Sequence, residues 1–184
     1  MEVENDAEEI MEAAGSVSTW PQSREGLQAM FTDLVRALGR NDRATIERVE
    51  EQLDLDAERF GVAFTFDGSR QLGPGVVPGA HARLEALIAA VTALGPSATV
   101  TVTGAQGREL SDGTSHGLAP EMVSVRSFLR PQIWYHRVVV ASGSRAVVFE
   151  PVAMVGGHWT WLGAPWTALS AAPATPGTPV VRAR

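Results

Sequence analysis

Residues Gln132–Leu162 read QIWYHRVVVASGSRAVVFEPVAMVGGHWTWL, and this stretch decides the fold. It consists of runs rich in valine, alanine and aromatic residues, which favour β-strands. Gly143-Ser144 and Gly156-Gly157 interrupt the runs and are typical two-residue hairpin loops. The pattern therefore predicts an antiparallel meander with the strands Gln132–Ser142, Arg145–Val155 and His158–Leu162.

The two hairpin loops also predict the register of these strands, because the residues flanking each loop lie opposite one another. Arg137 is then opposite Glu150, and Met154 is opposite Trp159. Strict alternation predicts one face with Tyr135, Arg137, Val139, Val148, Glu150, Val152, Met154, Trp159 and Trp161. It predicts another face with Trp134, His136, Val138, Val140, Val147, Phe149, Ala153, His158 and Leu162. Both sets are largely apolar, so we expect cover on both faces. The helices can cover one face, and a partner subunit, the N-terminal segment or a late helix can cover the other; of these we expect a homodimer packed through the sheet.

Upstream of the meander the apolar residues recur with a helical period. The helices predicted on this basis are Ser23–Leu38, Arg43–Leu55 and Gly79–Leu94. Between the second and third we expect a short strand, Val62–Phe66, and a loop, Leu72–Gly79. After the third helix we expect the strand Thr99–Thr103, the loop Gly104–Gly117 and the strand Met122–Leu129. The fold class is therefore α+β, with N-terminal helices packed on a curved antiparallel sheet.

The 184 residues suit one domain, predicted for residues 20–170. Residues 1–19 form an acidic leader with six acidic and no basic side chains in its first fifteen positions, while the rest has as many acidic as basic side chains. Residues 171–184, rich in proline and alanine, are expected to be a disordered tail. A neutral body argues against a nucleic-acid partner. The absence of cysteine, of a signal sequence and of a long apolar run predicts a cytoplasmic protein without a membrane partner.

The order of elements resembles the NTF2-like superfamily, the cone-shaped α+β group that includes SnoaL-type cyclases and ketosteroid isomerase. Leu34–Ala44 is similar to the helix-turn-helix opening of many members, and His158–Leu162 to their closing strand. The resemblance implies a pocket between the curved sheet and the helices, and a dimer made by the outer side of the sheet. Catalytic members carry an Asp or His base in the cone, and no residue here maps onto that base.

Arg137 and Glu150 are the most interesting candidate pair, since they are expected to face each other on the predicted face with the two tryptophans. They are either a charged group in a ligand pocket or a cross-strand ion pair near the end of the sheet. Ligand contacts are expected from Trp159, Trp161, Met154 and Arg137. The four histidines lie on separate elements without ligand spacing, so neither a metal nor another cofactor is expected.

Three functional readings remain open. The first is a dimeric module that binds a small apolar molecule or a protein partner. The second is an isomerase, dehydratase or cyclase with Glu150 as base and Arg137 or Tyr135 as polarising group. The third is an assembly or immunity-type protein recognised through its acidic arm and its sheet. An enzyme should have Glu150 in an enclosed pocket with a raised pKa, a binding module should have a pocket and a Glu150 neutralised by Arg137, and an assembly protein should have no pocket.

Overall fold

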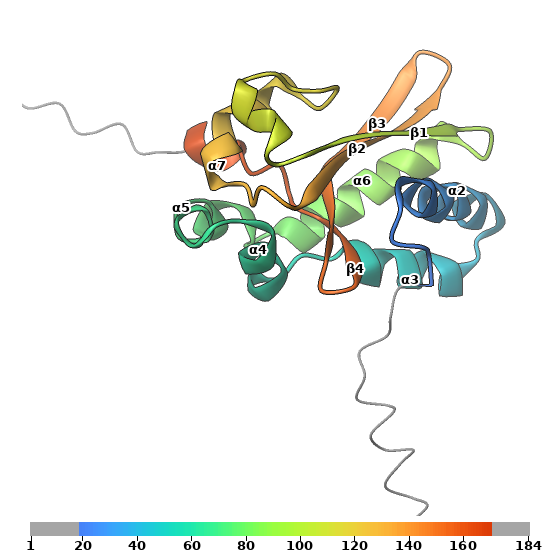
Figure 1. Ribbon diagram of the computed structural model, residues 1–184. Helices are drawn as coiled ribbons and strands as arrows, with labels where there is room; N and C mark the ends of the chain where they lie inside the picture. The colour runs from blue at the N-terminus through green and yellow to red at the C-terminus, as the bar shows by residue number, and fades with distance from the viewer. Residues whose placement is uncertain (1–18, 171–184) are drawn as a thin grey trace, which may run out of the picture.

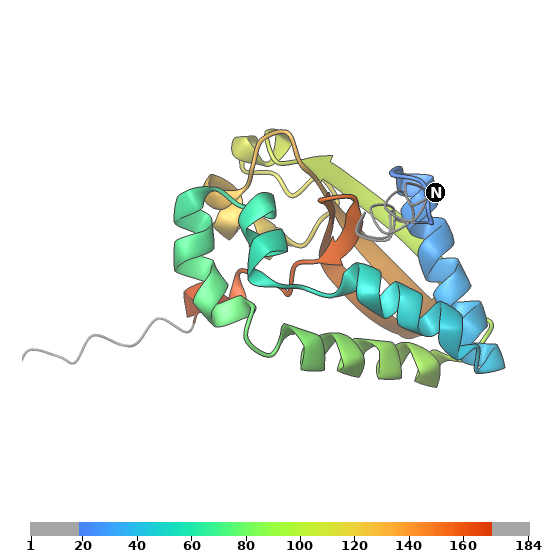
Figure 2. The ribbon, with the colours of Figure 1, turned by 90° about the horizontal axis from the view of Figure 1, so that it is seen from below.

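The computed structural model describes residues 19–170, and it has the α+β architecture that the sequence predicts (Figure 1). A four-stranded antiparallel sheet has the strand order β1-β2-β3-β4 and is not closed into a barrel. Helices α2, α3 and α6 lie together along one side of the sheet (Figure 2). The predicted acidic leader, except for Thr19, and the predicted tail lie outside the described residues.

The first two helices confirm the apolar stripes in the sequence. Helix α2 runs Arg24–Arg40, and the side chain of Ser23 caps its start by accepting a hydrogen bond from the N–H of Gly26. Helix α3 runs Arg43–Leu53 and is capped in the same way by Asp42. The two helices pack against each other and bring their apolar faces onto the sheet.

The next segment differs from the sequence prediction. Helix α4 spans Ala57–Ala63 and helix α5 spans Phe66–Val76, so the predicted strand Val62–Phe66 is wrong. The predicted loop Leu72–Gly79 is wrong for residues 72–76 and correct for the turn at residues 77–79. Side-chain caps explain the difference, because Asp56 accepts from the N–H of Arg59 and Thr65 accepts from the N–H of Gly68. Gly73, Pro74 and Gly75, which indicate a loop, lie in the second half of α5, whereas Pro78 and Gly79 lie in the turn before the next helix.

Helix α6, Ala80–Leu94, confirms the third predicted helix, and strand β1, Thr99–Gln106, confirms and extends the strand that follows. The predicted strand Met122–Leu129 is wrong. This region forms two 3-10 helices, η1 at Glu109–Asp112 and η2 at Pro120–Phe128. Proline at the first position of η2 suits a helical start, and the buried Met122 and Val125 are three residues apart, as one side of a 3-10 helix requires.

Strands β2, Trp134–Ser142, β3, Arg145–Val155, and β4, His158–Trp161, form the predicted meander with both predicted hairpin loops. The register has one irregularity, a bulge in β3. Val138 pairs with Phe149 but His136 pairs with Val152, so that Glu150 and Pro151 together stand opposite Arg137.

Because of the bulge, each later residue of the meander lies on the opposite face of the sheet from the one that strict alternation predicts. Val152, Trp159 and Trp161 join Val138 and Phe149 in the core formed with α2, α3 and α6. Tyr135 packs with residues of the opposite face in a second core under α4, α5, η1 and η2. The predicted grouping of Trp159 and Trp161 with Arg137 and Glu150 is therefore wrong, because one extra residue inverts every later position of β3.

The second face of the sheet is covered only in part. Its end near Tyr135 lies under the second core, which supplies the cover that the sequence required. Its other end, around Val139 and Val148, remains half exposed. Within residues 19–170 no single helix is long and apolar enough to cross a bilayer, and only the bent pair α5 and α6, at 67°, passes a test of length and composition.

Candidate functional site

A partly open cleft of about 580 Å³ lies where the start of α2 approaches the sheet. Gln22, Ser23 and Arg24 form its helical side, and residues from β1, β2, β3 and β4 form its sheet side. A volume of this size suits a metabolite-sized molecule, since ligand pockets commonly measure about 300–1,000 Å³. The cleft is therefore the strongest candidate for a binding site among the described residues.

Aromatic rings form the sheet side of the cleft. Trp134 stacks on His136 with ring centroids 6.2 Å apart and an interplanar angle of 25°. Trp159 meets the same imidazole edge-on at 5.5 Å. Trp134 is 48 % exposed, whereas His136 and Trp159 are buried, and Ile133 and Met154 add aliphatic surface. The cleft thus combines an accessible indole face with a buried aromatic floor.

Gly104 makes room for the imidazole at this site. It pairs with His136 across β1 and β2, and a Cβ atom on it would lie 2.6 Å from ring carbon Cδ2. Contacts under about 3 Å do not occur for real Cβ atoms, so a side chain here would displace the ring. The pairing of glycine with histidine at this register therefore defines the shape of the cleft.

His136 and Trp159 are only 5 % and 1 % exposed, and their nitrogens His136 Nδ1 and Trp159 Nε1 are enclosed by protein atoms. Burial lowers the pKa of His136, a hydrogen bond with the backbone of Val152 acts in the opposite direction, and the positive charge of Arg24 lowers the pKa further. The two rings therefore contribute aromatic surface to the cleft.

The predicted pair Arg137 and Glu150 forms an ion pair, but on the other side of the sheet. Arg137 Nε lies 3.4 Å from Glu150 Oε2, and Glu150 also accepts a hydrogen bond from the N–H of Ala119. Burial raises the pKa of Glu150, while Arg137 and the Ala119 hydrogen bond act in the opposite direction. Glu150 does not line the cleft, and its arrangement matches the cross-strand ion pair considered from the sequence.

Tyr135 is also occupied by structural contacts. Its hydroxyl donates to the carbonyl of Ala63 at 2.6 Å and accepts from the N–H of Arg130 at 3.0 Å. The residue is fully buried, and burial raises the pKa of its phenol. The hydroxyl joins β2 to α4 and has little capacity left for a substrate.

The structure therefore divides the residues expected at one site. Trp159 and Met154 line the cleft, Trp161 is buried in the core beside it, and Arg137, Glu150 and Tyr135 lie on the opposite face.

Sequence reasoning missed Arg24, Gly104, Trp134 and His136 as parts of one site. The pairing of Gly104 with His136 depends on the register between β1 and β2, which a long intervening loop leaves open. The position of Trp159 beside His136 depends instead on the bulge in β3. Pro151 was the available signal for this bulge, because proline inside a strand is typical of one.

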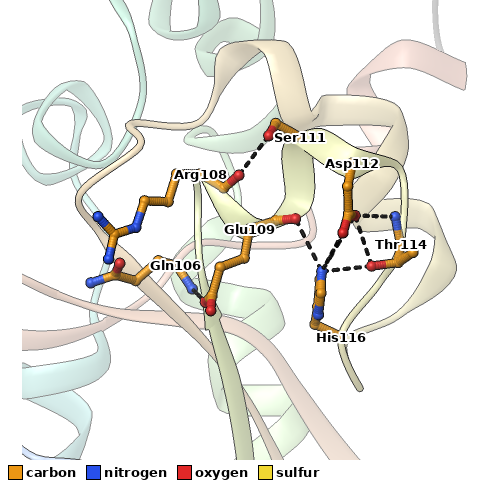
Figure 3. A network of polar contacts seen from close by, with 7 residues as sticks. All are labelled: Gln106, Arg108, Glu109, Ser111, Asp112, Thr114 and His116. Carbon is orange, nitrogen blue, oxygen red and sulfur yellow. Dashed lines mark hydrogen bonds and ion pairs between the residues drawn. The ribbon is translucent and has the colours of Figure 1, made fainter.

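A second polar cluster lies in the loop around η1 (Figure 3). Nε2 of His116 contacts Asp112 Oδ2 at 3.1 Å and Thr114 Oγ1 at 2.6 Å. A catalytic triad needs the carboxylate and the hydroxyl on different ring nitrogens, so that the histidine can relay a proton between them. Here both lie on the same nitrogen, and the carbonyl of Glu109 lies on it as well, at 3.0 Å. The cluster therefore holds the loop together and does not have the geometry of a catalytic triad.

The remaining histidines also have structural contacts. His81 lies 3.1 Å from Asp54 on the surface, and His158 lies 3.2 Å from the side-chain nitrogen of Gln52. Within residues 19–170 no group of three His, Asp or Glu side chains is placed to hold a metal ion.

No family model, curated protein or solved structure matches the chain. The geometry of the cleft is accordingly the main guide to function.

Proposed function

We propose that this protein is an NTF2-like domain that binds a small molecule in the cleft between the start of α2 and the sheet. The observation that carries the proposal is the cleft itself, which has a volume of about 580 Å³ and combines the exposed ring of Trp134 with the buried rings of His136 and Trp159. A cleft of this size suits a metabolite-sized molecule. The order of helices and the antiparallel meander support the NTF2-like assignment.

The contacts of Glu150 favour binding over catalysis. Arg137 neutralises its charge, and the carboxylate lies outside the cleft. A general base must reach the proton that it removes, within a hydrogen bond or through one water molecule. Glu150, with Arg137 or Tyr135 as the polarising group, has no such access to a molecule in the cleft.

The test is a screen of a few hundred small planar compounds by two-dimensional ¹⁵N NMR. Each of the five tryptophans has an indole N–H signal, and Trp134→Phe and Trp159→Phe assign two of them. Compounds that occupy the cleft should shift the signals of Trp134 and Trp159, because both rings line it. The signal of Trp166, which does not line the cleft, serves as an internal control.

Hits that shift Trp159 and compete with one another for saturable binding would support the proposal. A screen in which no compound moves the Trp134 or Trp159 signals, or in which all signals move together, would overturn it.

The same proposal includes a homodimer formed through the exposed part of the second sheet face. This surface consists of Thr99, Thr101, Thr103, Val139, Ala141, Ala146 and Val148, and the partly exposed Arg137, opposite Thr103, lies at its edge. A sheet face that remains in water normally carries more charged residues, so a surface of threonine, valine and alanine suits contact with a second copy. The lack of cysteine also suits a reducing, cytoplasmic location.

A further inference from the structure

Strand β1 lies at the edge of the sheet, because the strand order β1-β2-β3-β4 gives it a neighbouring strand on one side. In an antiparallel pair, residues that direct both N–H and C=O toward the neighbouring strand alternate with residues that direct both away from it. Every second residue of β1 therefore presents a main-chain donor and acceptor at the free edge of the sheet.

Three hydrogen bonds identify which residues of β1 face the free edge. The register of β1 and β2 continues to Gly107 and Ile133, where the N–H of Gly107 donates to the carbonyl of Ile133 at 2.9 Å, so the odd-numbered positions bond to β2. The carbonyl of Val100 instead accepts from a glutamine side chain of α2 at 3.2 Å, and the N–H of Gln106 donates to a carboxylate of η1 at 2.6 Å. The even-numbered positions, Gly104 among them, therefore face outward.

Gly104 is the outward-facing residue of β1 that lines the cleft. It is half-buried, and a glycine has only main-chain atoms to present, so its part of the cleft wall consists of main-chain atoms. No loop or side chain of residues 19–170 forms a hydrogen bond with its N–H or C=O. A donor and an acceptor that lie side by side in the wall are complementary to a molecule with an acceptor and a donor side by side.

Aromatic surface adjoins these two main-chain groups. The ideal Cβ position of Gly104 is 2.6 Å from the imidazole of His136, and Trp134 stacks on the same imidazole with ring centroids 6.2 Å apart. Trp134 is 48 % exposed, so part of its ring is open to a molecule in the cleft. Because one imidazole separates Gly104 from Trp134, a ligand of about two fused rings is long enough to reach both.

We infer that the ligand is a planar bicyclic molecule that contains a cyclic amide. The amide carbonyl of the ligand accepts from the N–H of Gly104, its amide N–H donates to the carbonyl of Gly104, and its fused ring stacks on Trp134. A cyclic amide suits this pairing because the ring holds its N–H and C=O on the same side. The inference rests on the proposed function, since it specifies the class of molecule that the cleft binds.

Three probes test the inference on the full chain. The first, 2-quinolinone, has the cyclic amide and the fused ring, 1-methyl-2-quinolinone lacks the amide N–H, and 2-piperidinone has the cyclic amide without an aromatic ring. We expect 2-quinolinone to bind at least tenfold more tightly than either relative, measured by NMR titration. The methyl group leaves the carbonyl of Gly104 covered but unpaired, and the saturated ring cannot stack.

The amide signal of Gly104 reports the expected contact directly. A new hydrogen bond from its N–H to the carbonyl of 2-quinolinone should move the proton signal downfield in the ¹⁵N spectra used for the screen. The signal of Gly143, in the hairpin loop at the other end of β2, should stay in place and serves as the control.

Trp134→Ala tests the stacking. It should weaken the binding of 2-quinolinone about tenfold and leave that of 2-piperidinone unchanged, since only the quinolinone has an aromatic ring. Phe66→Ala removes another exposed aromatic side chain, which is 81 % exposed and lies outside the cleft, and it should alter neither affinity. The unchanged binding of 2-piperidinone shows that the variant is folded.

Equal affinity for 2-quinolinone and 1-methyl-2-quinolinone, an unmoved amide signal of Gly104, or unchanged affinities in Trp134→Ala would overturn the inference and leave a ligand-binding cleft in place. The inference also fails if 2-quinolinone does not bind while other compounds of the screen shift the indole signals of Trp134 or Trp159. If no compound of the screen binds either, the proposed function fails with it.

Discussion

The imidazole of His136 occupies the space where a side chain at residue 104 would otherwise lie, with ring carbon Cδ2 2.6 Å from the ideal Cβ position of Gly104. The two residues are paired across β1 and β2. The glycine therefore permits a histidine to be buried beside the cleft, and substitutions here test whether that burial is required.

Gly104→Ala should destabilise the protein by about 1–3 kcal/mol, because an added methyl group in a packed interior forces neighbouring groups to move. It should also shift the indole signals of Trp134 and Trp159, whose rings pack on His136. Urea denaturation and NMR measure the two effects.

Gly61→Ala is the matched control, because a Cβ atom at Gly61 meets nothing within 4 Å and the residue lies inside α4. It should stabilise the protein by about 0.5–1 kcal/mol. Equal effects of the two substitutions would contradict the role assigned to Gly104.

Glu150→Gln should change how stability depends on pH. Burial raises the folded-state pKa of Glu150 above 4.5, so the protonated form is favoured in the native protein. The contribution of this group is then fully present below pH 4.5 and decreases as the pH rises through the raised pKa. The wild type should therefore lose stability relative to Glu150→Gln as the pH rises from 4.5 to 7.5.

Denaturation curves of both proteins across this range provide the test. Glu58→Gln makes the same chemical change at an exposed position and should alter the free energy of unfolding by no more than about 0.5 kcal/mol. A wild type that gains stability over Glu150→Gln with rising pH would show that Arg137 and Ala119 outweigh the burial of the carboxylate.

Tyr135→Phe should cost about 1–3 kcal/mol, because the carbonyl of Ala63 and the N–H of Arg130 both lose a hydrogen-bond partner. The ring itself remains, so packing in the second core should be preserved. Chemical denaturation measures the loss, and an unchanged midpoint would show that water replaces the hydroxyl.

Val139→Lys should disrupt the proposed dimer, because it places a charge in the centre of the surface of threonine, valine and alanine side chains. Sedimentation at micromolar concentration should find the wild type as a dimer and the variant as a monomer with similar thermal stability. Ala93→Lys, at an exposed position of α6, should remain dimeric. A monomeric wild type would refute this part of the proposal.

Local patterns in the sequence predict much of the fold. The stripe from Leu27 to Leu38 identifies α2, and the loops Gly143-Ser144 and Gly156-Gly157 identify the meander with its pairs. These elements are specified by neighbours close in the chain, so periodicity and turn chemistry are sufficient. The same reasoning fails at Val62–Phe66, where apolar residues suggest a strand but Asp56 and Thr65 cap two short helices.

The candidate site was harder to predict because it depends on one extra residue. Alternation beyond Glu150 assigns Trp159 to the face of Arg137, whereas the bulge places it beside His136. The cleft further needs the start of α2 to approach β2, which is a contact between segments more than one hundred residues apart. The pairing of Arg137 with Glu150 is predicted correctly, because Glu150 is the first of the two bulged residues and the register counted from the Gly143-Ser144 loop holds as far as this position.

Strand β3 contributes side chains to both cores, and this should determine the order in which the protein unfolds. Val147 and Phe149 belong to the core with α2, α3 and α6, and Ala153 and Val155 belong to the core on the opposite face. Neither helical layer can therefore detach without exposing part of the same strand. Backbone amides of β2 and β3 should be the slowest in the molecule to exchange with deuterium, and the two layers should lose protection together as one cooperative unit.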